Sequence, residues 1–419
     1  MSLPATATEF DPATLDLVTP EHYTRDGYPH ATWTWLRRHA PVFWYERPNA
    51  DPFWAITKHA DIIELGKQPQ VFLNAPRLAV FTNDLPPPPE GQSRHLLNMD
   101  PPDHARYRRV TSAWFTPRAV QGMGEKVARV TRDVLDDAAK SADGDFVRDV
   151  SARITIAVIA EMLGVPRSDW QLLFRWTNEI IAPQDPEFQH GSTPYETIER
   201  ARMDLFTYFH ELSEARRAQP SDDIVSVVAN GAVNGEALPP VELLSYYLLL
   251  VVAGNETTRN AMTGGLLALL ERPGEWEKLR RNPALVDCAV EEIVRWTTPV
   301  IQFARTATRD YELRGTRIRA GQSVCLFYPS ANRDEDVFDD PYTFDVRRDP
   351  NPHIGFGAAG PHFCLGAHLA RQEIEVMFRR LFERLPDIES VGEPDRLLSP
   401  FINGIKHLDC KFTPAVATP

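Results

Sequence analysis

The sequence predicts an α+β fold that is mainly helical and has a minor β portion. Between about residues 105 and 270, apolar residues recur at spacings of three and four, which is typical of amphipathic helices. Short runs rich in β-branched and aromatic residues, bounded by turn residues, lie near 40–60 and 300–330. Because helices and strands do not alternate regularly, the sequence does not predict a parallel sheet built from βαβ units.

The individual elements follow in order along the chain. The first 35 residues are rich in proline and aspartate, and we expect them to be irregular before the first helix. Two short strands are expected within 41–56, around a turn at 48–51. The apolar run 154–163 predicts a helix that ends at Gly164, because glycine readily adopts the left-handed conformation that closes many helices. Further along, the pattern predicts a helix at 285–296, strands at 303–308, 317–318 and 323–327, and a last long helix at 365–385.

The 419 residues are expected to form one domain, 1–419, because no repeat or low-complexity linker divides the sequence. A hydrophobic share of 43% and a charged share of 25% are typical of a globular protein with a large core. The helix-rich body is expected at about 100–300 and 365–385, and the β-rich portion at about 40–60, 300–330 and 385–415.

Composition and charge exclude several classes of protein. The net charge of −13 disfavours binding to nucleic acid or to an anionic membrane surface. The most apolar stretch, 243–253, is too short to span a bilayer and the N-terminus is unlike a signal peptide, so we expect no membrane insertion and a cytoplasmic location. The four cysteines form no CxxC or CxxH pair, which argues against a zinc site and a disulfide framework. The GxGxxG fingerprint of dinucleotide binding is also missing from the sequence.

A single cysteine, Cys364, lies in a glycine-rich loop just before the last predicted helix. Backbone N–H groups and the positive end of the dipole at a helix N-terminus favour an anion, so we expect a lowered thiol pKa and an anionic metal ligand. Gly360 and Gly366 have no side chain, so the backbone there can approach a flat macrocycle closely. Judged without its neighbours, Cys364 is equally compatible with a structural cysteine in a turn.

The whole string from Asn351 to Gly366, NPHIGFGAAGPHFCLG, resembles the haem-ligand signature of the cytochrome P450 family. The resemblance implies that Cys364 is the thiolate ligand of a haem b iron, and that haem lies between a long central helix and the helix after the cysteine. Gly357 occupies the place of the family's usual phenylalanine, and Phe356 comes one residue earlier. This extension is similar to that of actinobacterial sterol and branched-lipid hydroxylases. Further haem contacts are implied for Phe356, Gly360, His362 and Gly366.

Polar residues follow an apolar run in the string Ala253-Gly-Asn-Glu-Thr-Thr258. Glu256 and Thr257 place an acid next to an alcohol, a pair able to relay protons to a buried oxygen, although a helix end capped by threonine would give a similar string. Gly254 makes room for a ligand or water. The string resembles the oxygen-activation motif of the P450 central helix, which implies catalytic roles for Glu256 and Thr257 and haem contacts for Ala253 and Gly254.

Two further groups of charged residues match the family by position. Glu292 and Arg295 lie three residues apart, which by itself predicts a surface ion pair of little energetic value. The resemblance implies instead a buried structural triad of Glu292, Arg295 and Arg348.

His104 and Arg108 share one helix face and by default would be solvated. The resemblance implies that His104, Arg108, Arg305 and His362 hold the two haem propionates.

The resemblance implies a monooxygenase that inserts one atom of O2 into an unactivated C–H bond, while the other atom leaves as water. Nothing in the sequence indicates flavin or iron–sulfur binding. The resemblance implies that electrons come from NAD(P)H through a ferredoxin and its reductase, and we expect a monomer. Basic residues near Cys364, such as Arg118 and Arg371, would attract an acidic partner. The rival interpretations are a peroxide-driven enzyme and a non-catalytic haem-thiolate protein or gas sensor. Glu256 and Thr257 favour the use of O2 over both rivals.

The substrate is expected to be largely hydrophobic, because the segments that would wall the site are mostly apolar. The strings at 253–260, 351–356 and 403–407 are especially similar to those of bacterial cholesterol and cholestenone side-chain hydroxylases and methyl-branched lipid ω-hydroxylases. We therefore expect hydroxylation at the end of a steroid side chain or a branched isoprenoid lipid. A terpene, a fatty acid and an intermediate tethered to a carrier protein are the alternatives. The expected substrate contacts are Leu78, Val80, Val252, Val300, Phe401 and Ile402.

Overall fold

The N-terminal part of the chain is more regular than the sequence predicts. The computed structural model describes residues 15–83, 85 and 94–414, so the first 14 residues lie outside it. Within the described part, helix α1 spans Pro20–Asp26 and α2 spans His30–His39. The expectation of an irregular chain up to about residue 35 is therefore wrong there. Both helices are short and weakly patterned, and α2 is held by the burial of Trp33 and Leu36 in the core beside the strands.

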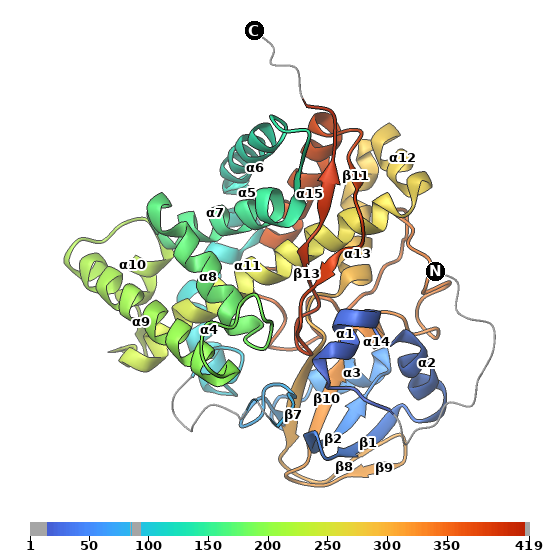
Figure 1. Ribbon diagram of the computed structural model, residues 1–419. Helices are drawn as coiled ribbons and strands as arrows, with labels where there is room; N and C mark the ends of the chain where they lie inside the picture. The colour runs from blue at the N-terminus through green and yellow to red at the C-terminus, as the bar shows by residue number, and fades with distance from the viewer. Residues whose placement is uncertain (1–14, 84, 86–93, 415–419) are drawn as a thin grey trace.

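Most of the molecule is a body of helices around one long helix, α11 (Pro240–Leu270), as Figure 1 shows. The others are α3 (His59–Gly66), α4 (Asp103–Thr111), α5 (Pro117–Gly122), α6 (Gly124–Ala138), α7 (Ala152–Leu163), α8 (Trp170–Ile181), α9 (Pro194–Ala218), α10 (Ile224–Ala229), α12 (Pro273–Arg281), α13 (Val286–Thr297), α14 (Tyr328–Ala331) and α15 (Ala367–Arg384). α11 packs against α7, α8, α9, α13 and α15. The predicted fold, mainly helical with a minor β portion, is confirmed.

Several helix boundaries follow from local sequence. α7 ends at Leu163 because Gly164 adopts the left-handed conformation with φ of +72°, as predicted. α13 and α15 lie within two residues of their predicted ranges. α11 continues well beyond residue 258, so the polar string at 253–258 lies in the middle of a helix and not at its end. The apolar residues that follow it keep the helix packed against its neighbours.

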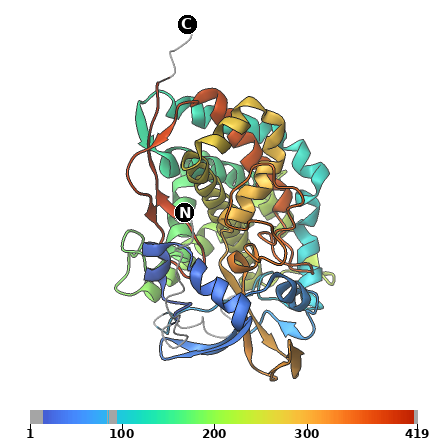
Figure 2. The same cartoon turned by 90° about the vertical axis from the view of Figure 1, so that its right-hand side faces the viewer.

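The largest sheet has five strands in the order β1-β2-β10-β7-β3. These strands are β1 (Val42–Arg47), β2 (Ala50–Ile56), β3 (Phe72–Leu73), β7 (Gln302–Ala307) and β10 (Ser323–Phe327). β2 and β10 pair in parallel, and the other neighbours pair antiparallel. The hairpin predicted within 41–56 and the strand predicted at 323–327 are both confirmed. In both views the sheet lies at one end of the helical body (Figure 1, Figure 2).

The C-terminal segment returns to the helical body through short strands. These are β4 (Asp143–Asp145), β11 (Glu389–Ser390), β12 (Asp395–Arg396), β13 (Ile405–His407) and β14 (Asp409–Lys411). β14 pairs with both β4 and β11, and β12 pairs with β13. Two small hairpins, β5 (Ala232–Val233) with β6 (Glu236–Ala237) and β8 (Tyr311–Leu313) with β9 (Thr316–Ile318), complete the strands. The C-terminal ribbon therefore connects segments that are far apart in sequence.

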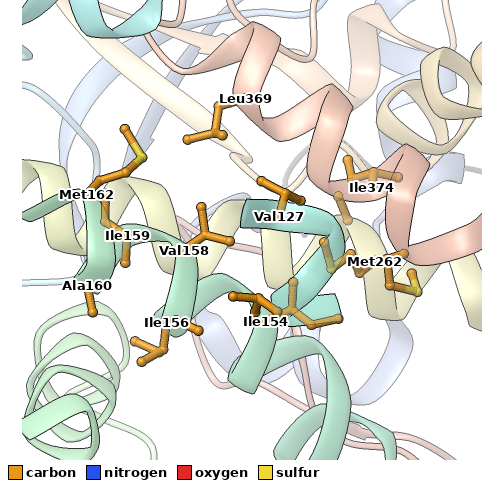
Figure 3. Packing of buried hydrophobic residues seen from close by; sticks show 14 of the residues in the cluster. Val127, Ile154, Ile156, Val158, Ile159, Ala160, Met162, Met262, Leu369 and Ile374 are labelled. Carbon is orange, nitrogen blue, oxygen red and sulfur yellow. The ribbon is translucent and has the colours of Figure 1, made fainter. Parts of the chain in front are cut away.

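The main hydrophobic core lies where α6, α7, α11 and α15 meet. Figure 3 shows its packing, with Val127 from α6, Ile154 and Val158 from α7, Met262 from α11 and Ile374 from α15 side by side. Full burial of an aliphatic side chain of this size contributes about 1.5–3 kcal/mol. This core holds the two helices that frame the candidate site, α11 and α15, in fixed relative positions. In the described part of the chain, no helix has both the length and the apolar character needed to cross a bilayer.

Candidate functional site

Cys364 lies three residues before the first residue of α15, in a loop that folds back on itself. Its backbone N–H donates a hydrogen bond to the carbonyl oxygen of Phe356 at 2.9 Å. Its side chain is accessible although protein surrounds it closely. Burial raises the pKa of the Cys364 thiol, and the opposing effects of the Gly366 N–H, Arg108 and Arg371 are smaller. The expected lowered pKa is therefore wrong for the protein chain alone, because desolvation outweighs the helix N-terminus.

The glycines of this loop have different surroundings. Gly360 has φ of +143°, and a Cβ there would collide with the carbonyl oxygen of Gly66 at the end of α3. The loop is pressed against α3 at this point, which gives Gly360 a packing role, and its expected haem contact stays a prediction. A Cβ at Gly366 would meet no atom within 4 Å. The space beside Gly366 is therefore open, as its expected role requires.

Phe356 packs on the helix that follows the loop. The guanidinium of Arg371 lies 4.3 Å from the centre of its ring. Arg371 is also paired with Glu291, whose oxygens accept from Nε at 2.6 Å and from Nη2 at 2.9 Å. The charge of Arg371 is therefore already compensated, which corrects the expectation that it attracts an acidic partner. Arg118, the other basic residue expected there, is exposed.

Ala253 and Thr257 line one accessible face of α11. Ala253 is exposed although most residues of this helix are buried. Thr257 lies one turn further along, and its Oγ1 donates to the carbonyl oxygen of Ala253 at 2.9 Å. Gly254 faces α7 instead, because a Cβ there would come within 3.1 Å of Ile159 Cδ1. Gly254 therefore has a role in helix packing, and its expected haem contact stays a prediction.

Glu256 is buried and turned towards α8, in contrast to its neighbour Thr257. Its carboxylate pairs with the buried guanidinium of Arg259, and Arg259 donates to Asn178 Oδ1 on α8 at 3.0 Å. Asn255 Nδ2 donates to Glu256 Oε1 at 3.2 Å. Burial raises the pKa of Glu256, and Arg259 acts in the opposite direction. Sequence reasoning missed Arg259, although its position three residues after Glu256 could have indicated the pair.

The four residues expected at the propionates, His104, Arg108, Arg305 and His362, form a cluster of protonatable side chains. We call it the cation cluster, because each side chain is positively charged when protonated. The rings of His104 and His362 lie 3.9 Å apart between centroids, and Asn74 contacts His362 Nε2 at 2.8 Å. Burial and the neighbouring cations lower the pKa of His104 to about 4 and that of His362 to about 2. His104 Nδ1 is buried without a hydrogen-bond partner among the described residues. Burial likewise lowers the pKa of Arg108 and Arg305, so the cluster fits a ligand that brings anionic groups.

Glu292, Arg295 and Arg348 come together as the resemblance implied. Arg295 donates from Nε and Nη2 to the two oxygens of Glu292, each at 2.7 Å, and both side chains are fully buried. Arg348 Nε lies 3.2 Å from Glu292 Oε2, close enough for an ion pair, and its Nη atoms donate to backbone carbonyls. Asn351 Nδ2 donates to Glu292 at 3.1 Å. The triad therefore ties α13 to the segment that leads into the Cys364 loop.

Four of the six residues expected to contact substrate meet in one apolar cluster. We define the apolar cluster as Ile181, Ala182, Phe188, Val252, Val300, Leu397, Phe401 and Ile402. The ring of Phe401 lies 5.8 Å from that of Phe81 and 5.5 Å from that of Phe303. Val252 is itself partly exposed and lies in the same turn of α11 as Ala253, so the cluster reaches the turn that carries the accessible face. Sequence reasoning missed Ile181, Ala182 and Phe188, which lie at the end of α8 and in the loop after it.

The other two expected substrate contacts lie closer to the sheet. Val80 is fully buried in the core beside the strands, and its backbone pairs with the side chain of Gln302 at 2.8 and 3.2 Å. Val80 therefore lies in a core position, and its expected substrate contact stays a prediction. The carbonyl oxygen of Leu78 accepts from the backbone N–H of Ala304 at 2.7 Å, and the side chain of Leu78 stays partly exposed.

A hollow of about 500 Å³ between α6, α7 and α8 is lined by none of the expected site residues.

Comparison with known proteins agrees with this site. The cytochrome P450 family pattern matches residues 20–386. This chain belongs to the cytochrome P450 family. Members of the family bind haem through a cysteine thiolate and use O2 and electrons from redox partners. The protein is therefore a P450 monooxygenase, which excludes the rival interpretation as a non-catalytic haem-thiolate sensor.

Relatives of this P450 are named for reactions on steroids and lipids. It is 39% identical to the steroid C26-monooxygenase of Mycolicibacterium smegmatis, over 91% of this chain and 90% of the relative. It is 41% identical to the methyl-branched lipid omega-hydroxylase of Mycobacterium tuberculosis, over 94% of this chain and 92% of the relative. Among solved structures, a Mycobacterium marinum cytochrome P450 in complex with pseudoionone superposes with a TM-score of 0.90. That protein shares 35% identity, and the match covers 97% of this chain and all of that one.

Proposed function

We propose that this P450 hydroxylates an unactivated C–H bond at the end of a hydrophobic chain, on a steroid side chain or a methyl-branched lipid. The observation that carries the proposal is the apolar cluster beside the accessible face of α11. Its lining is aliphatic and aromatic, so it favours a substrate that brings no charge into the cluster. The relatives named as steroid C26-monooxygenase and methyl-branched lipid omega-hydroxylase support the same class of substrate.

We propose that Cys364 ligates the iron of haem b, between the Cys364 loop and α11. The accessible thiol and the open space beside Gly366 fit a flat macrocycle, and the cation cluster fits its two carboxylates. In the bound state a metal ion deprotonates a coordinating thiol directly, so the raised pKa of the Cys364 thiol does not oppose ligation. When bound, haem supplies the one-electron chemistry that activates O2. Propionate contacts are assigned to His104, Arg108, Arg305 and His362.

We further propose that one domain, 1–419, acts as a monomer and receives electrons from NAD(P)H through a ferredoxin and its reductase. Arg118 is the exposed cation that this docking would use near Cys364, because Arg371 is already paired.

Thr257 would hold a proton at its Oγ1 on the accessible face of α11. Glu256 would pass protons towards Thr257 after leaving Arg259, since the carboxylate is held by that arginine in the structure.

Replacement of Thr257 by alanine tests the proton relay. The variant should keep haem and substrate binding, since among the described residues its side chain hydrogen-bonds only to the carbonyl of Ala253 in its own helix. Loss of a positioned proton donor should lower the rate of hydroxylation by about 10²-fold. Electrons should then appear as hydrogen peroxide, measured against NADPH consumption and product. Thr257→Ser, which keeps the hydroxyl, serves as control. Tight coupling in Thr257→Ala would contradict the relay.

The substrate class is tested by an optical titration of the ferric protein. Sterols with a branched side chain and methyl-branched lipids should displace the water on iron and shift the spin state, whereas matched compounds carrying a terminal carboxylate should bind far more weakly. Widening the cluster with Phe401→Ala should change the preference among chain lengths without loss of the haem spectrum. A response to carrier-tethered acyl chains alone would contradict the proposal.

A further inference from the structure

A loop and a ribbon both contribute residues to the apolar cluster. The loop comprises residues 182–193, between α8 and α9, and contributes Ala182 and Phe188 to the apolar cluster. The ribbon comprises β12, β13 and the residues between them, and contributes Leu397, Phe401 and Ile402. Hydrophobic contact alone would let these segments slide, because it has no directional preference. Polar groups just outside the cluster fix their relative position.

Lys406 on β13 is the centre of these polar contacts. Its ammonium lies 3.1 Å from Asp185 and 3.3 Å from Glu187, both in the loop, and 3.4 Å from Asp395 on β12. The side chains of Lys406 and Asp185 are largely buried. Asp185 also accepts from the backbone N–H of Leu398 at 3.1 Å. Buried charges of opposite sign in direct contact are costly to separate, because each would remain desolvated and uncompensated.

His407, the next residue, makes a second contact to the same loop. Its Nε2 lies 3.0 Å from Glu187, and its Nδ1 lies 2.6 Å from Asp145 on β4. Behind Asp145, Asp149 accepts from the Asp145 N–H and is itself paired with Arg148. The other charged groups nearby are Lys406 and Asp395, together with Asp409, which pairs in register with Asp145.

Acidic groups therefore outnumber basic ones around the ring of His407. Burial alone would lower the pKa of His407, but the hydrogen bonds and charges of Asp145 and Glu187 outweigh it and raise the pKa.

Glu187, Asp395 and His407 are close enough together to suggest a metal site, since their ligand atoms lie within 4.8 Å of one another. However, the Lys406 ammonium lies next to both carboxylates. A metal ion there would have to displace a cation that the chain itself supplies. The group is thus better explained as an ion-pair cluster in which Lys406 takes the central position.

We propose that Lys406 and His407 are positioning residues that clamp the 182–193 loop onto the β13 ribbon, and so control the access of hydrophobic substrates to the apolar cluster. The identity of that cluster as the substrate site rests on the proposed function, whereas the clamp itself does not.

The direction in which pH changes the stability of the clamp follows from His407. A raised folded-state pKa means that protonated His407 stabilises the clamp at low and neutral pH, and that this stabilisation is lost as pH rises through the raised value.

Hydrogen exchange of the haem-loaded, full-length protein tests the clamp without reference to catalysis. Peptides covering 182–193 and 395–407 should exchange about tenfold faster in Lys406→Met than in the wild-type protein, because local opening no longer separates buried opposite charges. Lys406→Arg should restore most of the protection. The matched control is Lys411→Met on β14, whose exposed pair with Glu389 should leave exchange in both segments unchanged. Equal exchange in Lys406→Met and wild type would overturn the clamp.

The pH dependence provides a second readout that a merely structural role of His407 would not change. After correction for intrinsic exchange rates, protection of the loop in the wild-type protein should fall between pH 6 and pH 9, and this fall should disappear in His407→Gln. A fall of equal size in His407→Gln would refute the role of the histidine.

The rate of the substrate-induced spectral change separates the clamp from the proposed function. If exchange responds to Lys406→Met but no steroid or lipid produces a spectral change, the clamp stands and the proposed substrate class fails. If these substrates bind but at equal rates in wild type and Lys406→Met, control of access is refuted.

Discussion

Replacing Cys364 with serine is expected to abolish hydroxylation completely and to remove the red-shifted Soret band of the reduced carbon monoxide adduct. A serine hydroxyl is a far weaker acid than a thiol, so it does not supply the anionic sulfur ligand that pushes electron density onto iron. The cation cluster of His104 and Arg305, and the Glu292 triad, are untouched by the change. Folding should therefore persist, and some haem should remain bound with an altered spectrum.

The matched control for this experiment is Cys288→Ser. Cys288 is a half-buried cysteine whose Sγ lies 3.2 Å from the carbonyl oxygen of Arg348, and a serine hydroxyl can make the same contact. This variant should keep the carbon monoxide spectrum and the activity of the wild-type protein. A normal Soret band in Cys364→Ser, or its loss in Cys288→Ser, would contradict the assignment of the ligand.

Replacing Arg295 with leucine should lower the free energy of unfolding by about 3–5 kcal/mol, more than any other substitution proposed for this protein. The substitution leaves the Glu292 carboxylate fully buried without its main cation. It also removes donors to the carbonyl oxygens of Asn332 and Pro341, which hold the segment before the Cys364 loop. Urea unfolding of the haem-loaded protein measures the change, and haem retention on a desalting column should fall in parallel.

The chain offers an exposed pair of the same spacing as a control. Glu277 and Arg280 on α12 are also three residues apart and pair through two hydrogen bonds of 2.8 and 2.9 Å, but Arg280 is half exposed. Arg280→Leu should leave the free energy of unfolding nearly unchanged, because solvent screens such pairs. Equal losses in the two variants would mean that burial is not what makes the Glu292–Arg295 pair important.

Local sequence was sufficient to predict the backbone conformation wherever one residue or one short run of residues decides it. Gly164 ends α7 because glycine alone adopts its left-handed φ without strain, and the strand at 323–327 follows from its run of apolar residues. The short helices α1 and α2 were missed because their stability comes from packing against strands that lie elsewhere in the sequence. Isolated helices of that length are marginal in water.

The candidate site shows the same division at the level of side chains. The resemblance implied Cys364, the cation cluster and the Glu292 triad as groups, because their residues match the family's motifs position by position. The directions of Gly254 and Gly360 were not predictable, since they depend on Ile159 and Gly66 in other elements. Glu256 and Thr257 are adjacent in sequence, yet only the packing of α8 against α11 turns the acid towards Arg259 and leaves the alcohol on the accessible face.

The sequence by itself indicated the family and the reaction class and pointed to Cys364 as the proposed ligand, because short strings in it resemble those of the family. The tertiary structure alone decided which surfaces meet. It brought Phe188 and Phe401 into one apolar cluster, placed Lys406 among three carboxylates, and raised the pKa of Cys364 by burial. The physical reason is that burial and ion pairing depend on distances in space. Residues more than 200 positions apart acquire such distances only when the chain packs.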